Sequence, residues 1–366
     1  MTESKRKHNG IFGILFGITA RTAMLMNAGV LVLSYLSMYV NPSKAWFMTV
    51  FGILFILFFA VNLFLLLWAL RRRSRAVVIP LVALLPAFFL MGRYIQMGNS
   101  PDPDASADIR IVSYNVGKFS QAASRLKLSG AGECADSVFA FLLRTDADVI
   151  CLQEFHIDDA GAMKKYLASK MDGYASEYYI NVDDNGAYGN VTLSRFPVVD
   201  KGKFDFDHSS NLAIYTDLRV GDRTVRVYNC HFESYNISVS RLLHALSRND
   251  NETVGEAEEK MRSSITRRPE QVGMILDDIH DSPVESIVAG DFNDTPMSYT
   301  YTKLKQGHKD SFMEAGKGMG GTYSLLWPFI RIDYVLFPDF MKAVSHKVKR
   351  IGWSDHYPII TELKNI

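Results

Sequence analysis

The feature that most constrains the fold of this chain is a run of 26 residues, Ala45 to Leu70, without a single charged side chain. About 20 apolar residues are enough for a helix to cross the hydrocarbon layer of a bilayer. Two more uncharged runs flank it: Thr22 to Val40, of 19 residues, and Ala76 to Gly92, of 17. We therefore expect three transmembrane helices, at about 22–40, 45–70 and 76–95, in a membrane anchor that covers residues 1–97.

The basic residues around these runs predict how the anchor is oriented. Lys5 to Lys7 and Arg71 to Arg75 are the clusters of positive charge, and such clusters stay on the cytoplasmic side. Three crossings then leave everything after residue 98 outside the cytoplasm. A cleaved signal peptide does not explain three successive apolar runs. The apolar stretch Ile11 to Ala20 is too short to span a membrane, so it either lies at the membrane surface or lengthens the first helix.

The net charge of +1 hides two oppositely charged parts. Of the 40 Lys and Arg and the 39 Asp and Glu residues, ten basic and three acidic residues lie in 1–107, which makes this part +7. The remainder keeps 30 basic and 36 acidic residues and is −6. A charge of −6 argues against a domain that binds long nucleic acid through a basic surface. Lys118, Lys127, Arg267 and Arg268 are the candidates for a local basic patch, although such residues are more often solvated surface charges.

Residues 98–107, rich in Pro, Asp and Ser, predict a linker, and a soluble domain of residues 108–366 follows. Its predicted strands are Ile109–Tyr114, Val149–Leu152, Asn190–Ser194, Thr224–Tyr228, Ser286–Ala289 and Tyr334–Phe337. Its predicted helices are Ala135–Arg144, Ala160–Lys170, Val239–Ser247 and Pro269–His280. The charged stretch from Arg248 to Arg268 predicts a solvated loop that leads into the last helix. Strands interleaved with helices indicate an α/β fold.

Polar residues gather where these strands stop, which is how α/β folds build sites. The residues concerned are Asn115, Glu154, His231, Asp291 and Asn293, together with Asp333, Asp355 and His356 farther along. Each one alone has a structural explanation, as a turn residue, a helix cap or the partner in an ion pair. Their joint occurrence in this order favours one shared site.

The residue types suit metal-assisted attack on a phosphate ester. The carboxylate of Glu154 and the amide oxygen of Asn115 are ligands that Mg²⁺ prefers, and a bound cation polarises a phosphoryl oxygen. His356 is the expected base for the attacking water, with Asp333 orienting its imidazole.

Three further side chains have expected roles next to the phosphate. His231 and Asn293 can donate hydrogen bonds to phosphate oxygens. Asp291 can orient the nucleophile or assist at the leaving oxygen. The segment Phe312 to Pro328, with four glycines and several aromatic residues, is either a plain glycine-rich turn or a loop that faces the substrate.

Several motifs resemble those of the endonuclease/exonuclease/phosphatase superfamily of metal-dependent phosphoesterases, across essentially all of residues 108–366. The matching pieces are Ser113-Tyr-Asn115, Leu152-Gln-Glu154, Asn190 to Pro197, Asn229-Cys-His231-Phe-Glu, Gly290-Asp-Phe-Asn-Asp294, Arg331-Ile-Asp333-Tyr and Ser354-Asp-His356. The resemblance implies a four-layer α/β sandwich, in which two facing mixed sheets are flanked by helices and the site lies at one edge.

The resemblance also implies roles for the site residues. Asn115 and Glu154 would lie at the metal, Mg²⁺ or alternatively Mn²⁺, with Asp355 near it. His356 paired with Asp333 would be the base, although such enzymes are also argued to use the residue equivalent to Asp291. Asp291 and Asn293 would contact the phosphate and the nucleophile, and His231 would stabilise the transition state.

The predicted function is a membrane-anchored, divalent-metal-dependent phosphoesterase that acts on a phosphodiester or phosphomonoester. The anchor resembles that of membrane-attached bacterial members, which predicts an inner-membrane protein with its catalytic domain in the periplasm or outside. Its expected partners are the lipid bilayer and a phosphate-ester substrate: a lipid headgroup, an inositol phosphate or a nucleic acid. An extracytoplasmic DNA or RNA nuclease and a catalytically inactive binding module on the same scaffold remain alternatives.

Overall fold

The computed structural model describes residues 3–98, 107–120, 130–183, 186–207, 209–235, 244–245, 247–248 and 250–365. The chain divides into two compact units, Met1–Met91 with Met297–Tyr299 and Gly92–Pro296 with Thr300–Ile366. Most of the predicted linker 98–107, Lys127 and much of the predicted helix Val239–Ser247 lie outside the described residues.

The first unit is helical and strongly apolar. Its helices are α1 (Glu3–Leu36), α2 (Phe47–Ile53), α3 (Phe55–Arg71) and α4 (Val78–Leu90). Within the described residues, the segments Gly17–Leu36 and Arg75–Arg93 are long and apolar enough to cross a membrane. Helices α2 and α3 meet at a 60° bend and count as a third span only if taken together. The structure therefore supports two candidate spans, or up to three, and does not confirm the predicted number.

Polar side chains inside these helices bond across the helix pairs. The Nδ2 atom of Asn62 donates to the carbonyl oxygen of Asn27 at 3.1 Å, and Nδ2 of Asn27 donates to that of Phe58 at 3.3 Å. Such bonds satisfy amides that would otherwise be unpaired in an apolar setting. The stretch Ile11 to Ala20 continues helix α1, so it lengthens the first helix.

The second unit is built on two six-stranded mixed sheets. The first sheet has the strand order β13-β14-β2-β3-β5-β4 and the second the order β10-β12-β9-β8-β7-β6. The strands of the first are β2 (Ile109–Asn115), β3 (Val149–Ile157), β4 (Ala175–Asp183), β5 (Gly186–Ser194), β13 (Met341–Val348) and β14 (Ile359–Asn365). Those of the second are β6 (Val198–Asp205), β7 (Leu212–Val220), β8 (Arg223–His231), β9 (Glu285–Asp291), β10 (Lys309–Asp310) and β12 (Asp333–Phe337). Each sheet contains one parallel pair, β2 with β3 and β8 with β9.

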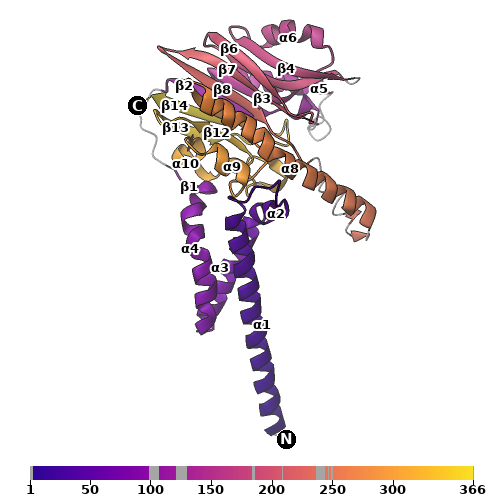
Figure 1. The fold of residues 1–366 in the computed structure, drawn as a ribbon, viewed down its shortest axis with the longest axis vertical. Helices are drawn as coiled ribbons and strands as arrows, with labels where there is room; N and C mark the ends of the chain where they lie inside the picture. The colour runs from indigo at the N-terminus through magenta and orange to yellow at the C-terminus, as the bar shows by residue number, and fades with distance from the viewer. Residues whose placement is uncertain are drawn as a thin grey trace. The chain divides into compact units, whose positions relative to one another are not determined.

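The two sheets face each other and helices cover their outer faces, which makes four layers (Figure 1). Side chains such as Ile111 and Val227 fill the space between the sheets. Helices α5 (Ala131–Thr145) and α6 (Met163–Lys170) cover the first sheet, and α8 (Asn251–Asp281) covers the second. The predicted α/β sandwich of two mixed sheets flanked by helices is confirmed.

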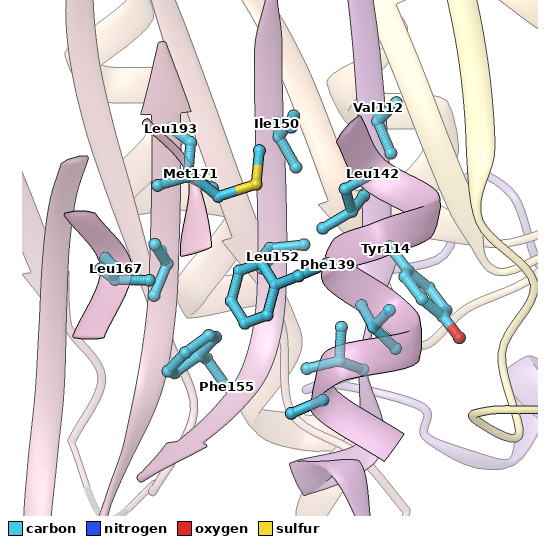
Figure 2. Packing of buried hydrophobic residues seen from close by; sticks show 14 of the residues in the cluster. Val112, Tyr114, Phe139, Leu142, Ile150, Leu152, Phe155, Leu167, Met171 and Leu193 are labelled. Atoms are coloured by element: carbon cyan, nitrogen blue, oxygen red, sulfur yellow. The ribbon is translucent and has the colours of Figure 1, made fainter. Parts of the chain in front are cut away.

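Apolar side chains hold helices α5 and α6 against the first sheet. Figure 2 shows Phe139 and Leu142 of α5 directed at the strand residues Ile150 and Leu152, with Leu167 of α6 beside them. All five side chains are buried. Their burial removes apolar surface from water and fixes both helices on the sheet.

All six predicted strands are present, but the predicted start of the long helix is wrong. Helix α8 begins at Asn251 and passes through Pro269. The side chain of Asp250 caps it by accepting a hydrogen bond from the Thr253 amide at 3.1 Å. A proline inside a helix costs about 3 kcal/mol. Here the burial of one helix face, with Ile265 and Val272 on it, offsets that cost, so the charged stretch is helical.

Candidate active site

The strand ends bring the predicted polar residues to one edge of the sandwich. Asn115 is the last residue of β2, and His231 and Asp291 are the last residues of β8 and β9. In the ladder of the second sheet, Asp291 lies opposite His231 on one side and opposite Asp333 on the other. Three of the candidate residues are therefore neighbours because of strand register alone.

His356 and Asp333 form a directly bonded pair in the site. The Nδ1 atom of His356 lies 3.0 Å from Oδ2 and 3.2 Å from Oδ1 of Asp333. The backbone amide of His356 donates to Oγ of Ser354 at 3.1 Å, and that of Asp333 donates to Oγ1 of Thr322 at 3.2 Å. The ring of Tyr323 packs edge-on at 5.5 Å from the imidazole. These contacts fix the ring orientation and leave Nε2 for chemistry.

Asp291 connects the His356 side of the site to the Glu154 side. Its Oδ2 atom accepts a hydrogen bond from Nδ2 of Asn115 at 3.0 Å and lies 3.6 Å from Nε2 of His356. Its Oδ1 atom accepts from the backbone amide of Asn293 at 2.8 Å. Asn293 has a φ of 51°, a left-handed conformation that is uncommon outside glycine and is frequent at functional sites.

Glu154 lies in an irregular part of β3. The pairing of β3 with β5 shifts between Leu152 and Phe155, and Glu154 has a φ of 51°. Such a bulge redirects a side chain at a sheet edge. The Oε1 atom of Glu154 accepts a hydrogen bond from Nδ2 of Asn115 at 3.1 Å and lies 3.6 Å from Nε2 of His231.

The Nε2 atom of His231 is buried and has no hydrogen-bond partner within the part of the chain that the structure describes. It also lies 3.9 Å from Oδ2 of Asp291. A buried polar atom without a partner is costly, so it indicates a ligand that the site is built to bind. An anionic oxygen of a bound ligand would accept a hydrogen bond from Nε2 of His231.

Asn115 presents its amide nitrogen, and not its oxygen, to the carboxylates. Its Oδ1 atom accepts a hydrogen bond from the backbone amide of Gly117 at 3.0 Å, which identifies that atom as the oxygen. In this rotamer Asn115 holds Glu154 and Asp291 in place by donating to both. Binding a metal through Oδ1 would require the amide to turn over.

Burial and neighbouring charges shift the pKa values of three site residues. Burial, with a smaller contribution from Asp333, raises the pKa of Asp291 to about 6 against the opposing effect of His356. Burial also raises the pKa of Asp355, where His356 opposes and Glu154 adds to the shift. For His356, burial works against the imidazolium, but Asp333 and Asp291 outweigh it and raise its pKa well above the usual value.

The donor set fits a divalent cation. Ligand atoms of Asp291, Asp333 and His356 lie within 4.8 Å of one another. These three side chains are buried and engaged with each other, whereas the side chain of Glu154 is 22% exposed. Mg²⁺ prefers oxygen ligands and keeps several waters, so the chemistry favours the more accessible Glu154, with Asp355 near it.

An uncharged layer of amide side chains beneath the site links the two sheets, and it was not predicted from the sequence. Nδ2 of Asn190 donates to the carbonyl oxygen of Asn229 at 2.9 Å, and Nε2 of Gln153 donates to Oδ1 of Asn229 at 2.7 Å. Nδ2 of Asn229 in turn donates to the carbonyl oxygen of Leu152 at 3.2 Å. Amide residues inside otherwise apolar strands were the only signal in the sequence.

Arg268 is not the solvated surface charge that the sequence suggested. It is buried, its Nη1 atom lies 3.2 Å from Oδ2 of Asp294, and its Nε atom donates to the carbonyl oxygen of Glu233 at 2.7 Å. Arg268 lies on the buried face of α8, which brings its guanidinium to the carboxylate of Asp294. The residue therefore holds the loop that carries Asn293.

The other two described basic candidates differ from Arg268. Lys118 is exposed, as expected of a surface charge. Arg267 is half-buried, and its Nη1 atom lies 3.4 Å from Oε1 of Glu233. Neither residue extends the described site into a broad basic surface.

Similarities to known families cover much of both units of the chain. A family model described as "Endonuclease/Exonuclease/phosphatase family" matches residues 112–356, and one described only as a domain of unknown function matches residues 14–94. A search of curated proteins finds no match.

Solved structures of similar fold cover the same part of the chain. An endonuclease/exonuclease/phosphatase from Beutenbergia cavernae has 18% identity and a TM-score of 0.52, over 71% of this chain and 72% of that one. A Bacteroides vulgatus endonuclease/exonuclease/phosphatase has 17% identity and a TM-score of 0.51, over 70% and 99%. The human Nocturnin catalytic domain has 17% identity and a TM-score of 0.50, over 70% and 94%. At these identities the likeness shows the fold.

Proposed function

Because the chain belongs to the endonuclease/exonuclease/phosphatase family, we propose that it is a membrane-anchored, divalent-metal-dependent phosphoesterase that hydrolyses a phosphodiester or phosphomonoester with water. Members of this family are hydrolases of phosphate esters and generally use divalent metals. The observation that carries the proposal is the His356–Asp333 pair, which lies next to Asp291 and at the same edge of the sandwich as Glu154.

Glu154 and Asp355 would hold the metal, Mg²⁺ or alternatively Mn²⁺, and Asn115 would join them if its amide turned over. A bound metal would polarise a phosphoryl oxygen and offset the negative charge that develops during attack. The raised pKa of Asp355 supports this assignment, because burial and the nearby Glu154 disfavour its charged form and a cation would offset both effects.

Side chains of the protein would accept the proton of the attacking water. Asp333 orients His356 through Nδ1, which leaves Nε2 facing Oδ2 of Asp291 at 3.6 Å. Two groups this close titrate as a pair, so we assign the acceptor role to His356 and Asp291 together. His356 as the sole base stays the prediction from the sequence; its raised pKa favours the imidazolium, so His356 must first be neutral to accept the proton.

The phosphate would be held from the opposite side of the site. The free Nε2 atom of His231 can donate to an oxygen on which charge develops, and such donors are most effective in a buried site. Asn293 keeps its amide nitrogen close to Asp291 by donating to the carbonyl oxygen of Phe232 at 2.9 Å. It would thereby position Asp291 next to the phosphate.

The membrane anchor is proposed from the N-terminal helices. Two apolar helical segments, Gly17–Leu36 and Arg75–Arg93, have the length of a span. If helices α2 and α3 together form a third span, the basic clusters at Lys5 to Lys7 and Arg71 to Arg75 would lie in the cytoplasm and the catalytic unit would lie outside it. In a bacterium this would be an inner-membrane protein with the domain in the periplasm or outside.

The two alternatives are less well supported. A nuclease would usually carry a basic surface, whereas the part after residue 107 has a net charge of −6. An inactive binding module would be expected to lack a central residue, whereas Glu154, His231, Asp291, Asp333 and His356 are all present.

The direct test uses the full chain purified in detergent and the soluble diester bis-p-nitrophenyl phosphate. We expect hydrolysis with Mg²⁺, loss of hydrolysis with EDTA, and loss with His356→Ala. The matched control is His280→Ala, because His280 is an exposed histidine on α8. Activity that persists through both EDTA and His356→Ala would refute the proposal.

A further inference from the structure

The second unit exposes four large apolar side chains within five consecutive residues. Leu325, Leu326, Trp327 and Phe329 are 58%, 46%, 41% and 49% exposed. We call these four residues the apolar lip. The other large apolar side chains exposed in the described part of this unit lie on other elements: Ile95 and Met97 on the short strand β1 (Ile95–Met97), Leu143 on α5, Val182 on β4 and Val199 on β6. An apolar surface of this kind usually marks an interaction site.

The apolar lip is joined directly to the candidate active site. Tyr323, two residues before Leu325, forms an isolated bridge with His356 and packs its ring 5.5 Å from the imidazole. The backbone amide of Ser324 donates to the carbonyl oxygen of Asp355 at 2.7 Å. Two residues of chain span at most about 7 Å, so the apolar lip begins at the edge of the site.

The backbone that carries the apolar lip is held in place. The amides of Thr322 and Tyr323 donate to the carbonyl oxygen of Ile330 at 2.9 and 3.2 Å, which closes the segment at its base. The amide of Phe329 donates to the carbonyl oxygen of Leu326 at 2.9 Å. The exposed side chains therefore belong to a defined loop and are directed outward by its conformation.

Positive charge borders the apolar lip. The guanidinium of Arg350 stacks on the ring of Trp327 at 4.6 Å, and the neighbouring Lys347 and Lys349 are exposed. Aromatic and aliphatic groups beside cations match a membrane surface, where acyl chains meet phosphate groups. The same chain carries two helical segments that could cross a bilayer.

We propose that the apolar lip inserts among the acyl chains at a bilayer surface, and that the substrate is a membrane lipid whose headgroup carries the phosphate ester. The second part rests on the proposed phosphoesterase function. A lipid with its ester at His356 would have its acyl chains next to Leu325 and Leu326, while Arg350 meets a neighbouring phosphate. The apolar lip is then a specificity element for lipid over soluble esters.

The first experiment measures membrane contact without any need for catalysis. A thiol-reactive, environment-sensitive fluorophore is attached to Leu325→Cys in the full chain, since Cys134, Cys151 and Cys230 are free but buried. The labelled protein is reconstituted in vesicles of phosphatidylcholine and phosphatidylglycerol. We expect blue-shifted emission that is quenched by bromine on the acyl chains. The control label at Val199→Cys, a site 53% exposed on β6, should emit as in water.

Three results would overturn the insertion. The label at position 325 could emit as in water, both labels could be quenched equally, or the label at 325 could shift without quenching by brominated lipid. The last result would mean that protein, such as a second copy of the chain, covers the apolar lip.

The second experiment addresses the substrate. The rates of hydrolysis of vesicle lipids (phosphatidylcholine, phosphatidylglycerol and a phosphoinositide) and of bis-p-nitrophenyl phosphate are measured for the unaltered protein and for the double variant Leu325→Ser/Leu326→Ser. We expect the ratio of lipid to soluble turnover to fall at least about fivefold, because two apolar contacts are lost. Val182→Ser/Val199→Ser should leave this ratio unchanged.

The outcomes separate the two proposals. Turnover of the soluble diester without turnover of any of these lipids, or an unchanged ratio in the Leu325→Ser/Leu326→Ser variant, overturns the lipid substrate. If the unaltered protein hydrolyses neither kind of ester, the phosphoesterase function fails and the lipid substrate fails with it. The fluorophore experiment then still decides whether the apolar lip contacts the membrane.

Discussion

The Nδ1 atom of His356 lies 3.0 Å from Oδ2 of Asp333, although the two residues are 23 positions apart and lie next to different sheets of the sandwich. Asp333 opens strand β12 of the second sheet, whereas His356 lies in the loop before β14 of the first. The contact therefore joins the two halves of the fold at the point where we place the chemistry.

This pair gives the first prediction. Asp333→Asn should lower kcat by about 10²- to 10⁴-fold with a small change in KM, because an amide no longer selects the productive state of the imidazole. Steady-state kinetics on the soluble diester measure both constants. The double variant with His356→Ala should be little worse than His356→Ala alone, since the residues act as a unit. Additive losses would contradict the pairing.

Glu154 gives a prediction about the metal. Glu154→Gln should raise the Mg²⁺ concentration that gives half-maximal activity by at least about tenfold, because a charged ligand is lost. Titration of the EDTA-treated protein with Mg²⁺ and then Mn²⁺ measures this. Glu285→Gln, at an exposed glutamate that begins β9, is the matched control and should titrate like the unaltered protein. An unchanged Mg²⁺ dependence in Glu154→Gln would remove Glu154 from the metal site.

The unpartnered Nε2 atom of His231 predicts a role confined to the transition state. His231→Ala should lower kcat and kcat/KM equally, by about 10²-fold, because the donated hydrogen bond matters only once charge develops on the phosphate. A rise in KM with kcat intact would instead indicate ordinary ground-state binding. Thermal unfolding checks that the variant remains folded.

Arg331 predicts a loss of stability. Its Nη1 atom lies 2.8 Å from Oδ2 of Asp310, and both side chains are almost completely buried. Arg331→Met should cost about 3–5 kcal/mol, because Asp310 is left buried without its cation. Adding Asp310→Asn should recover part of that loss, as measured by denaturant unfolding in detergent. For comparison, Arg195→Met breaks an exposed pair with Asp146 and should cost less than about 1 kcal/mol.

His346 predicts how stability depends on pH. Burial lowers the pKa of His346 to about 4, against about 6.5 in an unfolded chain. The contribution of His346 to the free energy of unfolding is therefore fully present above pH about 6.5. It falls as the pH drops from 6.5 towards 4, by up to about 3 kcal/mol. Unfolding midpoints at pH 7, 5.5 and 4.5 measure the slope. His346→Gln should flatten it, whereas His280→Gln should not; identical slopes in both variants would contradict this assignment.

Much of the site was predictable because strand ends are visible in the sequence. Apolar runs that stop at Asn115, His231 and Asp291 identify positions at a sheet edge, and strand register then makes His231, Asp291 and Asp333 neighbours. Other details depend on contacts between distant segments. The amide orientation of Asn115 is set by the backbone of Gly117, and the direction of Glu154 by a bulge against β5.

The rest of the fold was harder to predict for similar reasons. Strand β6 carries alternating charges and is the edge strand of its sheet, so it has little apolar signal. Arg268 looked like a surface charge because its partner Asp294 is far away in sequence. The proline at 269 suggested a helix start, but the buried face of α8 continues on both sides of it.

The hydrogen bonds among Gln153, Asn190 and Asn229 have a consequence for how this protein responds to its surroundings. These side chains do not titrate, so changes in pH and ionic strength leave this attachment between the sheets unaltered. Asp291, Asp355 and His356, whose pKa values are raised, can take up or lose protons without separating the two sheets. A change in pH would thus act on the chemistry through the site itself and leave the attachment between the sheets in place.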